Sequence, residues 1–85
     1  MKSFDYVIKD ELGVHARPAG ILVKKALEYD SGITIKKGDK QADAKRLFAL
    51  MSLGIKCGDK VTIICEGGDE EKAVNGMEKV FNDNV

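Results

Sequence analysis

Apolar side chains recur at every second position in several short segments of the chain, a pattern typical of β-strands. Residues 4–8 alternate in this way and predict a first strand. Residues 33–36 predict a second strand, and the turn-forming residues 37–40 predict a hairpin into a short, polar third strand over residues 41–43. Residues 61–65 are rich in β-branched side chains, which predicts a fourth strand that is well buried.

Three other segments repeat apolar residues at the three- and four-residue spacing of a helix. The first begins near residue 15, and Asp69 is expected to cap the last. A shorter helix is predicted over residues 47–53 and ended by Gly54. The resulting order is β-α-β-β-α-β-α, an α+β fold in which helices pack on one face of a sheet. The predicted core faces of the long helices are Ala19, Leu22, Val23, Ala26 and Leu27 in one, and Ala73, Val74, Met77, Val80 and Phe81 in the other.

The size and charge of the chain narrow the classes of function. Its 85 residues predict one domain over residues 1–85, with little room for a deep substrate pocket. Fourteen basic and fourteen acidic residues give a formal net charge of zero, which argues against a dedicated nucleic-acid binder. An RNA-binding domain would need a basic face, and a solvated hairpin explains the one dense basic segment more simply. That segment consists of Lys36, Lys37, Lys40, Lys45 and Arg46.

The two cysteines and the N-terminal residues favour a cytoplasmic location. Cys57 and Cys65 do not form the dense disulfide framework of small secreted domains, and with one distant histidine they are too few ligands for a structural zinc site. The first residues lack the apolar segment of a signal peptide, and no run of residues is long and apolar enough to span a membrane. We therefore expect two reduced thiols, no bound metal and no insertion into a membrane.

The most informative segment is residues 13–19, which holds the only histidine, the only proline and one of two arginines. Pro18 lacks an N–H and is tolerated only in the first turn of a helix, which places His15 at or near the N-cap. The N–H groups of Ala16 and Arg17 are then free to bind an anion, and a guanidinium suits phosphate oxygens. The pattern indicates a transient phosphohistidine. The alternative is that His15 only caps the helix and Arg17 is a solvated surface charge.

Two motifs resemble those of one protein family. The segment Gly13-Val14-His15-Ala16-Arg17-Pro18-Ala19 closely resembles the active-site signature of HPr, the histidine-containing phosphocarrier of the bacterial phosphoenolpyruvate:sugar phosphotransferase system. The segment Leu50-Met51-Ser52-Leu53-Gly54-Ile55 is similar to the second signature of the family. The length and the predicted order of elements match as well, so the resemblance covers nearly the whole chain.

The resemblance implies a fold and a function. HPr proteins are open-faced β-sandwiches, in which three helices cover one face of a four-stranded antiparallel sheet. They are carriers rather than enzymes and use no metal or cofactor. They accept a phosphoryl group from phosphorylated enzyme I and pass it to enzyme IIA domains of sugar permeases. Here His15 would be the acceptor, Arg17 would stabilise the phosphoryl group, and the backbone amides of Ala16 and Arg17 would add donors. The alternative is a regulatory protein-binding module on the same fold.

The second helix has too many apolar residues for one buried face. We expect Leu50 and Leu53 in the core. Leu47, Phe48 and Met51 could all be buried too, or could form an exposed patch, which in a small protein often marks a docking site. The resemblance favours docking, because HPr proteins meet donor and acceptor with this helix and the start of the first one.

The same resemblance extends the predicted docking surface to Gly20 and Lys24, with Lys45 and Arg46 as a charged rim. In many HPr proteins, HPr kinase phosphorylates a serine at the start of the second helix. Arg46 occupies that position here and has no hydroxyl, and Ser52 belongs to the second signature and is no substitute. This departure predicts that kinase control is absent. A carrier that alternates between partners is expected to work as a monomer.

Overall fold

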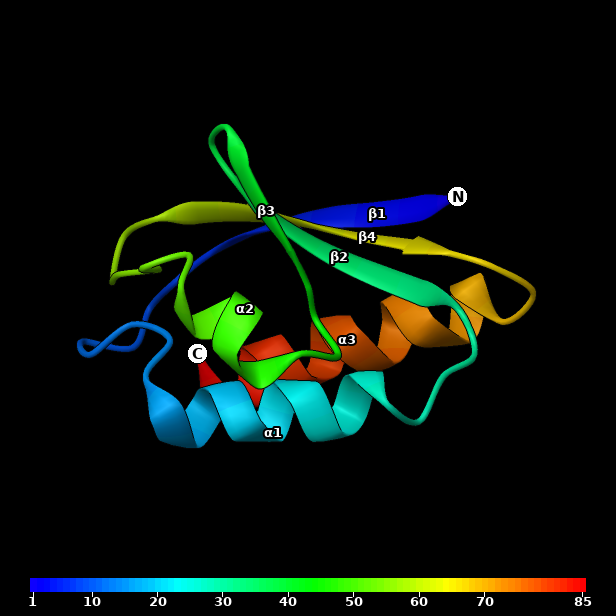
Figure 1. The fold of residues 1–85 in the computed structure, drawn as a ribbon, viewed down its shortest axis with the longest axis horizontal. Helices are drawn as coiled ribbons and strands as arrows, with labels where there is room; N and C mark the ends of the chain where they lie inside the picture. The colour runs from blue at the N-terminus through cyan, green and yellow to red at the C-terminus, as the bar shows by residue number, and fades with distance from the viewer.

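The computed structural model describes all of residues 1–85 and arranges them in two layers, a sheet and a set of helices (Figure 1). The order of elements is β-α-β-β-α-β-α, as the periodicity predicts. The strands are β1 (Lys2–Val7), β2 (Gly32–Lys37), β3 (Lys40–Asp43) and β4 (Lys60–Glu66), and the helices are α1 (Ala16–Ala26), α2 (Leu47–Met51) and α3 (Glu70–Asn84).

The four strands form one antiparallel sheet in the order β1-β4-β2-β3. The strand β4 lies between β1 and β2, so that Ile63 pairs with Phe4 on one side and with Ile35 on the other. Successive residues of β4 alternate between buried and half-buried, because their side chains point in turn to the face covered by helices and to the open face. All three helices cover the same face of the sheet (Figure 1). The predicted open-faced β-sandwich is therefore confirmed.

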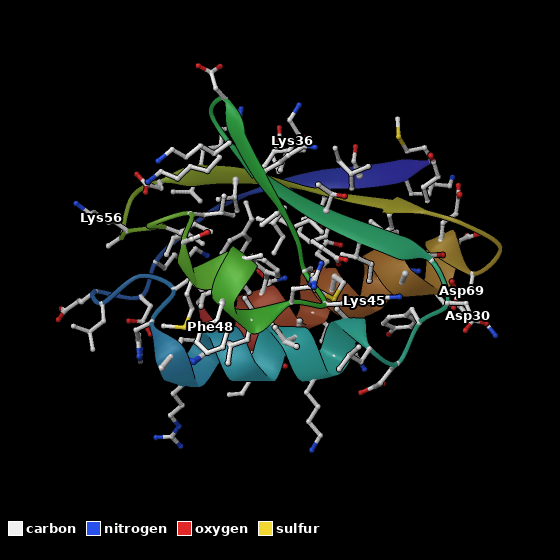
Figure 2. All side chains as sticks on the ribbon, in the orientation of Figure 1. Asp30, Lys36, Lys45, Phe48, Lys56 and Asp69 are labelled. Atoms are coloured by element: carbon white, nitrogen blue, oxygen red, sulfur yellow. The ribbon has the colours of Figure 1, made fainter.

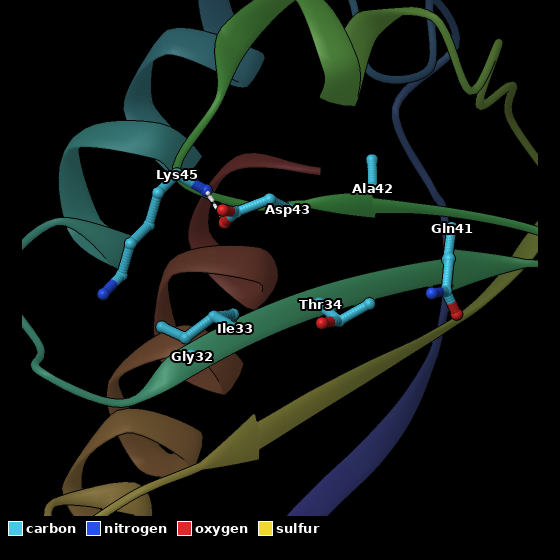
Figure 3. A pocket seen from close by; sticks show the side chains of 7 residues that line it. All are labelled: Gly32, Ile33, Thr34, Gln41, Ala42, Asp43 and Lys45. Atoms are coloured by element: carbon cyan, nitrogen blue, oxygen red, sulfur yellow. Dashed lines mark hydrogen bonds between the residues drawn. The ribbon is translucent and has the colours of Figure 1, made fainter.

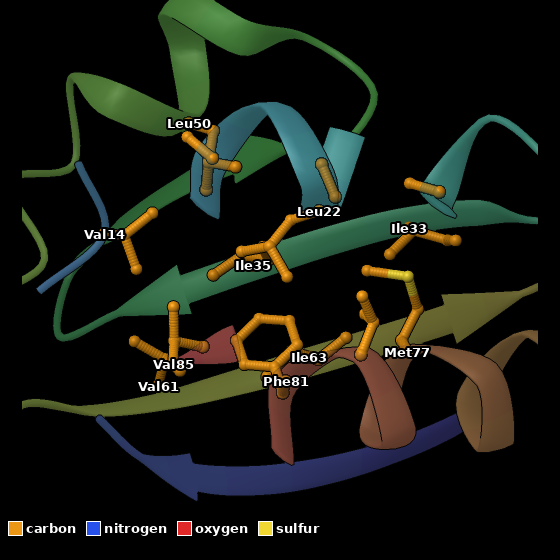
Figure 4. Packing of buried hydrophobic residues seen from close by; sticks show 14 of the residues in the cluster. Val14, Leu22, Ile33, Ile35, Leu50, Val61, Ile63, Met77, Phe81 and Val85 are labelled. Atoms are coloured by element: carbon orange, nitrogen blue, oxygen red, sulfur yellow. The ribbon is translucent and has the colours of Figure 1, made fainter. Parts of the chain in front are cut away.

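The core fills the space between this sheet face and the two long helices (Figure 4). Leu22 of α1 and Met77 of α3 are fully buried opposite the isoleucines of the central strands. The Phe81 ring packs edge-on against two aromatic rings of β1, with centroid separations of 5.8 Å to Phe4 and 5.5 Å to Tyr6. Such edge-to-face pairs add to the stabilisation from apolar burial. This packing ties the C-terminal helix to the N-terminal strand.

Two helix ends differ from the expected ones. The helix α2 stops at Met51, because Leu53 and Gly54 donate to carbonyls three residues back and Gly54 then takes a positive φ of 62°. Leu53 nevertheless reaches the core, as predicted. The helix α1 stops at Ala26, so the expectation that Leu27 belongs to its buried face is wrong. The side chain of Leu27 is 62% exposed.

Asp69 precedes α3 as predicted, but its carboxylate does not cap that helix. It accepts hydrogen bonds from the backbone N–H groups of Asp30 and Ser31, each at 2.9 Å, and from the Ser31 hydroxyl. The Ser31 hydroxyl, followed by the backbone donors, holds the pKa of Asp69 below its usual value. Figure 2 shows Asp30 and Asp69 together beside the start of β2, after the loop that follows α1. This network fixes the loop after α1 to the start of α3. None of the three helices has the length and apolar character needed to cross a membrane.

Candidate functional site

The loop before α1 is held in a fixed conformation. The Asp10 carboxylate accepts a hydrogen bond from the Leu12 N–H at 2.9 Å, and the Gly13 N–H donates to the Asp10 carbonyl at 2.9 Å. The Val14 N–H donates to the carbonyl of Ile55 at 3.1 Å. Gly13 has a positive φ of 67°, and a Cβ atom there would lie 2.3 Å from the Ile55 oxygen. Only glycine fits at position 13. The close approach of the two backbone segments therefore explains why the signature around His15 begins with a glycine.

Gly13→Ala is expected to lower the free energy of unfolding by about 2 kcal/mol or more, because it adds a backbone clash to the cost of a left-handed residue. Gly38→Ala is the matched control, since Gly38 has a similar φ of 58° but open space around it. It should cost only about 1 kcal/mol. Urea unfolding of both variants measures the difference. Equal decreases in the free energy of unfolding of the two variants would show that the contact with Ile55 does not hold the loop.

His15 occupies the N-cap of α1, with an extended backbone at φ −91° and ψ −174°. Its carbonyl accepts the Ala19 N–H at 2.9 Å, which is the first hydrogen bond of the helix. The N–H groups of Ala16 and Arg17 donate to no other group of the chain. The placement predicted from Pro18 is therefore confirmed. The His15 side chain makes no capping hydrogen bond and is half-buried.

A surface pocket of about 300 Å³ contains both His15 and Arg17. Arg17 is exposed and forms no ion pair, so its guanidinium is available to an anion. The free amide groups and the positive end of the α1 dipole lie at the same helix terminus. The arrangement suits a bound or transferred phosphoryl group. The remaining lining residues are Asp10, Pro18, Ile21, Asp83 and Asn84.

No group of three or more His, Cys, Asp or Glu side chains in the chain is placed to bind one metal ion. Both cysteines are free thiols: Cys57 is exposed, and burial raises the pKa of the Cys65 thiol. Neither lines the pocket of His15. Among the residues that line this pocket, Arg17 carries the one guanidinium, and the free helix amides add neutral donors.

The predicted apolar patch is exposed on α2. Phe48 is 85% exposed, and Leu47 and Met51 are each exposed by more than a third, whereas Leu50 is buried. In Figure 2, Phe48 lies on the side of α2 that is next to α1. The alternative in which all these side chains are buried is thus excluded. The apolar surface is available for a partner.

Gly20, Lys24 and Arg46 are also exposed, the first two on α1 and the third just before α2. Lys45 lines a hollow together with Arg46, Leu47 and Phe48, so it lies at the predicted charged rim beside the apolar patch. The residue is half-buried, and its ammonium donates to the Tyr29 carbonyl at 2.7 Å. Sequence reasoning missed Ile21, which is 38% exposed and lines the pocket of His15. The one signal in the sequence was that this apolar residue stands in the helix directly before a core residue.

A larger hollow of about 390 Å³ lies beside β2 and β3 (Figure 3). It contains no histidine or cysteine, and Lys45 of the charged rim is the one residue it shares with the predicted docking surface. Its Asp43 carboxylate accepts the backbone N–H of Lys45 at 2.9 Å, which closes the turn after β3. The turn at the end of β3 therefore accounts for this hollow. The pocket of His15 remains the candidate site.

Comparison with known proteins agrees with this site. The family model described as "PTS HPr component phosphorylation site" matches residues 2–83. The phosphocarrier protein HPr of Mycoplasma pneumoniae is 41% identical over 82 residues, covering 95% of this chain and 93% of the relative. That of Mycoplasma capricolum is 36% identical over 83 residues, covering 98% and 93%. The crystal structure of HPr from Thermoanaerobacter tengcongensis superposes with a TM-score of 0.94 at 36% identity, covering 99% of this chain and 94% of that one. The chain therefore belongs to the HPr family, the phosphocarrier proteins of the phosphotransferase system.

Proposed function

We propose that His15 accepts a phosphoryl group from phosphorylated enzyme I and passes it to enzyme IIA domains of sugar permeases. The observation that carries the proposal is that His15 and an unpaired Arg17 line one surface pocket at a helix terminus with free amide groups. In the forward step, the lone pair of a ring nitrogen forms a bond to phosphorus. The bond between phosphorus and the donor breaks, and its electron pair returns to the donor. The onward step reverses these roles with the acceptor.

Arg17 and the backbone amides of Ala16 and Arg17 would stabilise the phosphoryl oxygens during both steps. The guanidinium can bind two oxygens at once, and the amide groups are already oriented by the helix. Because these donors are in place before the reaction, little reorganisation is needed as charge develops. The chain itself supplies these groups, without a metal or cofactor.

A regulatory binding module on the same fold would need the docking surface but not the pocket. The combination of His15, Arg17 and the free helix terminus in one pocket favours the carrier. The relatives named as phosphocarrier proteins favour it as well. We expect the carrier to work in the cytoplasm, with reduced thiols, and as a monomer, because its docking surface must be free to meet two partners in turn.

The docking surface consists of Leu47, Phe48 and Met51 on α2 with Gly20 and Lys24 on α1. Its apolar side chains include a flexible methionine, which suits a surface that meets more than one partner. Arg46 lies at its edge and adds a positive charge. Partners with an apolar centre and acidic groups around it would complement it.

Phe48→Ala is expected to weaken binding to enzyme I by about 10-fold or more, because large exposed aromatic residues at the centre of a docking surface often dominate affinity. The fold should not change, since the side chain is 85% exposed. Calorimetric titration with enzyme I measures the affinity. Leu27→Ala is the control, an exposed apolar residue after the far end of α1. Equal affinities for Phe48→Ala and the unaltered protein would remove Phe48 from the interface.

Arg46 occupies the N-cap position of α2, where the regulatory serine of other HPr proteins begins the helix. The unaltered protein is expected to gain no phosphoserine from HPr kinase and ATP, whereas Arg46→Ser restores an acceptor hydroxyl. A phosphoserine there would place roughly −1.5 to −2 charges beside the docking surface. Mass spectrometry after incubation measures the modification. A stoichiometric phosphoserine on the unaltered protein, at Ser52 or elsewhere, would refute the loss of kinase control.

The full relay tests the proposed function. Radiolabelled phosphoenolpyruvate, enzyme I, this protein and an enzyme IIA domain are combined, and label is followed on each protein. Label is expected on the IIA domain only when this carrier is present. Enzyme I that becomes labelled without passing label to the carrier would favour the regulatory module.

A further inference from the structure

We propose that Asp10 and Asp83 set how readily the phosphorylated carrier gives up its phosphoryl group, by placing two negative charges in the pocket of His15. This inference rests on the proposed phosphorylation of His15. It concerns the free energy of the phosphorylated form. That free energy depends on nearby negative charges as well as on Arg17 and the helix amides.

Two acidic residues from opposite ends of the chain line the pocket. Asp10 lies in the loop before α1, and Asp83 lies in the last turn of α3. Asp10 accepts the Leu12 N–H at 2.9 Å, and Asp83 forms an exposed ion pair with the Lys79 ammonium at 3.1 Å, which compensates part of its charge. Neither forms an ion pair with Arg17. They therefore do not neutralise the guanidinium by direct contact, and their charges remain part of the field in the pocket.

A phosphoryl group on His15 would bring up to two negative charges close to both carboxylates. His15, Asp10 and Asp83 line one pocket of about 300 Å³, and repulsion between charges closer than the Debye length, about 10 Å at 0.1 M salt, is only partly screened. Arg17 and the amide groups act in the opposite direction. The sum of the two effects determines the stability of the phosphorylated form.

Opposing attraction and repulsion of the phosphoryl group suit a carrier. Donors that only attracted the phosphoryl group would stabilise the phosphorylated form and hold back the onward step. Like charges nearby raise its free energy relative to free His15. With Asp10 and Asp83 in place, Arg17 can assist transfer in both directions without making the phosphorylated carrier a trap.

The test is the equilibrium constant for transfer from phosphorylated enzyme I to the carrier, measured from the distribution of label at low salt. Asp10→Asn and Asp83→Asn should each shift it toward the phosphorylated carrier by about 3- to 10-fold. Asparagine keeps the side-chain oxygen that accepts the Leu12 N–H, so the loop is retained. Lys79→Met should shift it the other way, because Asp83 loses its compensating charge. Asp43→Asn, on β3 and outside the pocket, is the control and should change nothing.

The outcomes separate this inference from the proposed function. If the unaltered protein takes no label from enzyme I, the proposed function fails. If it takes label but both asparagine variants have its equilibrium constant, the assignment of Asp10 and Asp83 is overturned. The predicted shifts should shrink in 1 M salt, and a shift that is unchanged there would also contradict an electrostatic cause.

Discussion

His15→Ala is expected to accept no phosphoryl group from phosphorylated enzyme I. The nucleophilic ring is lost, and no other histidine exists in the chain to replace it. The fold should be retained, because the His15 side chain is half-exposed and makes no capping hydrogen bond. Label transferred from phosphoenolpyruvate through enzyme I measures acceptance, and thermal unfolding measures the fold.

The result is informative only if the variant still docks. His15→Ala should therefore compete with the unaltered carrier for enzyme I, because Phe48 and its neighbours on α2 are unchanged. Label on a folded His15→Ala variant would show that the acceptor is another residue. Loss of both label and competition would mean that the substitution has disturbed the docking surface.

Arg17→Ala is expected to slow phosphoryl transfer by about 100-fold while the acceptor stays intact, in the range found when one preorganised donor to a developing anion is removed. The transfer rate of Arg17→Lys should lie between those of Arg17→Ala and the unaltered protein, because an ammonium keeps the charge but loses the planar fork that binds two oxygens. Rapid-quench measurement of single transfers in both directions gives the rates. The reduced rate should appear in both directions, since the same oxygens are stabilised on the way in and out.

Lys72→Ala is the matched control for Arg17→Ala, since Lys72 is an exposed cation on α3 without an ion pair. It should transfer at the rate of the unaltered protein. If Arg17→Ala also matched that rate, Arg17 would be only a surface charge. If both variants were slow, the effect would be one of overall charge rather than of the site.

The site was predictable from local sequence because its parts are neighbours in the chain. Pro18 can stand only in the first turn of a helix, and this alone places His15 at the terminus. The alternation of the strands was equally local, and the buried residues of β4 follow it. Excess apolar residues on a short helix left open whether Phe48 is buried or exposed, and the family resemblance favoured the exposed position that the structure shows.

Other features depended on contacts between distant segments. Asp83 and Asn84 join the pocket of His15 because α3 ends beside the start of α1, and no spacing in the sequence indicates this. The Lys45 side chain is tied to Tyr29 by a hydrogen bond across a loop. Asp69 had the right position for a helix cap, but the donors of Ser31 compete for its carboxylate. Tertiary contacts of this kind decide which group a side chain meets.

The most direct test of the account is to locate the phosphoryl group. The unaltered protein is incubated with phosphoenolpyruvate and enzyme I, digested at neutral or mildly alkaline pH, and sequenced by mass spectrometry. The account predicts one phosphoryl group on the peptide that contains His15, attached to the imidazole and lost in acid, as expected of a phosphorus–nitrogen bond. An acid-stable phosphoryl group, or one on any other residue, would contradict it.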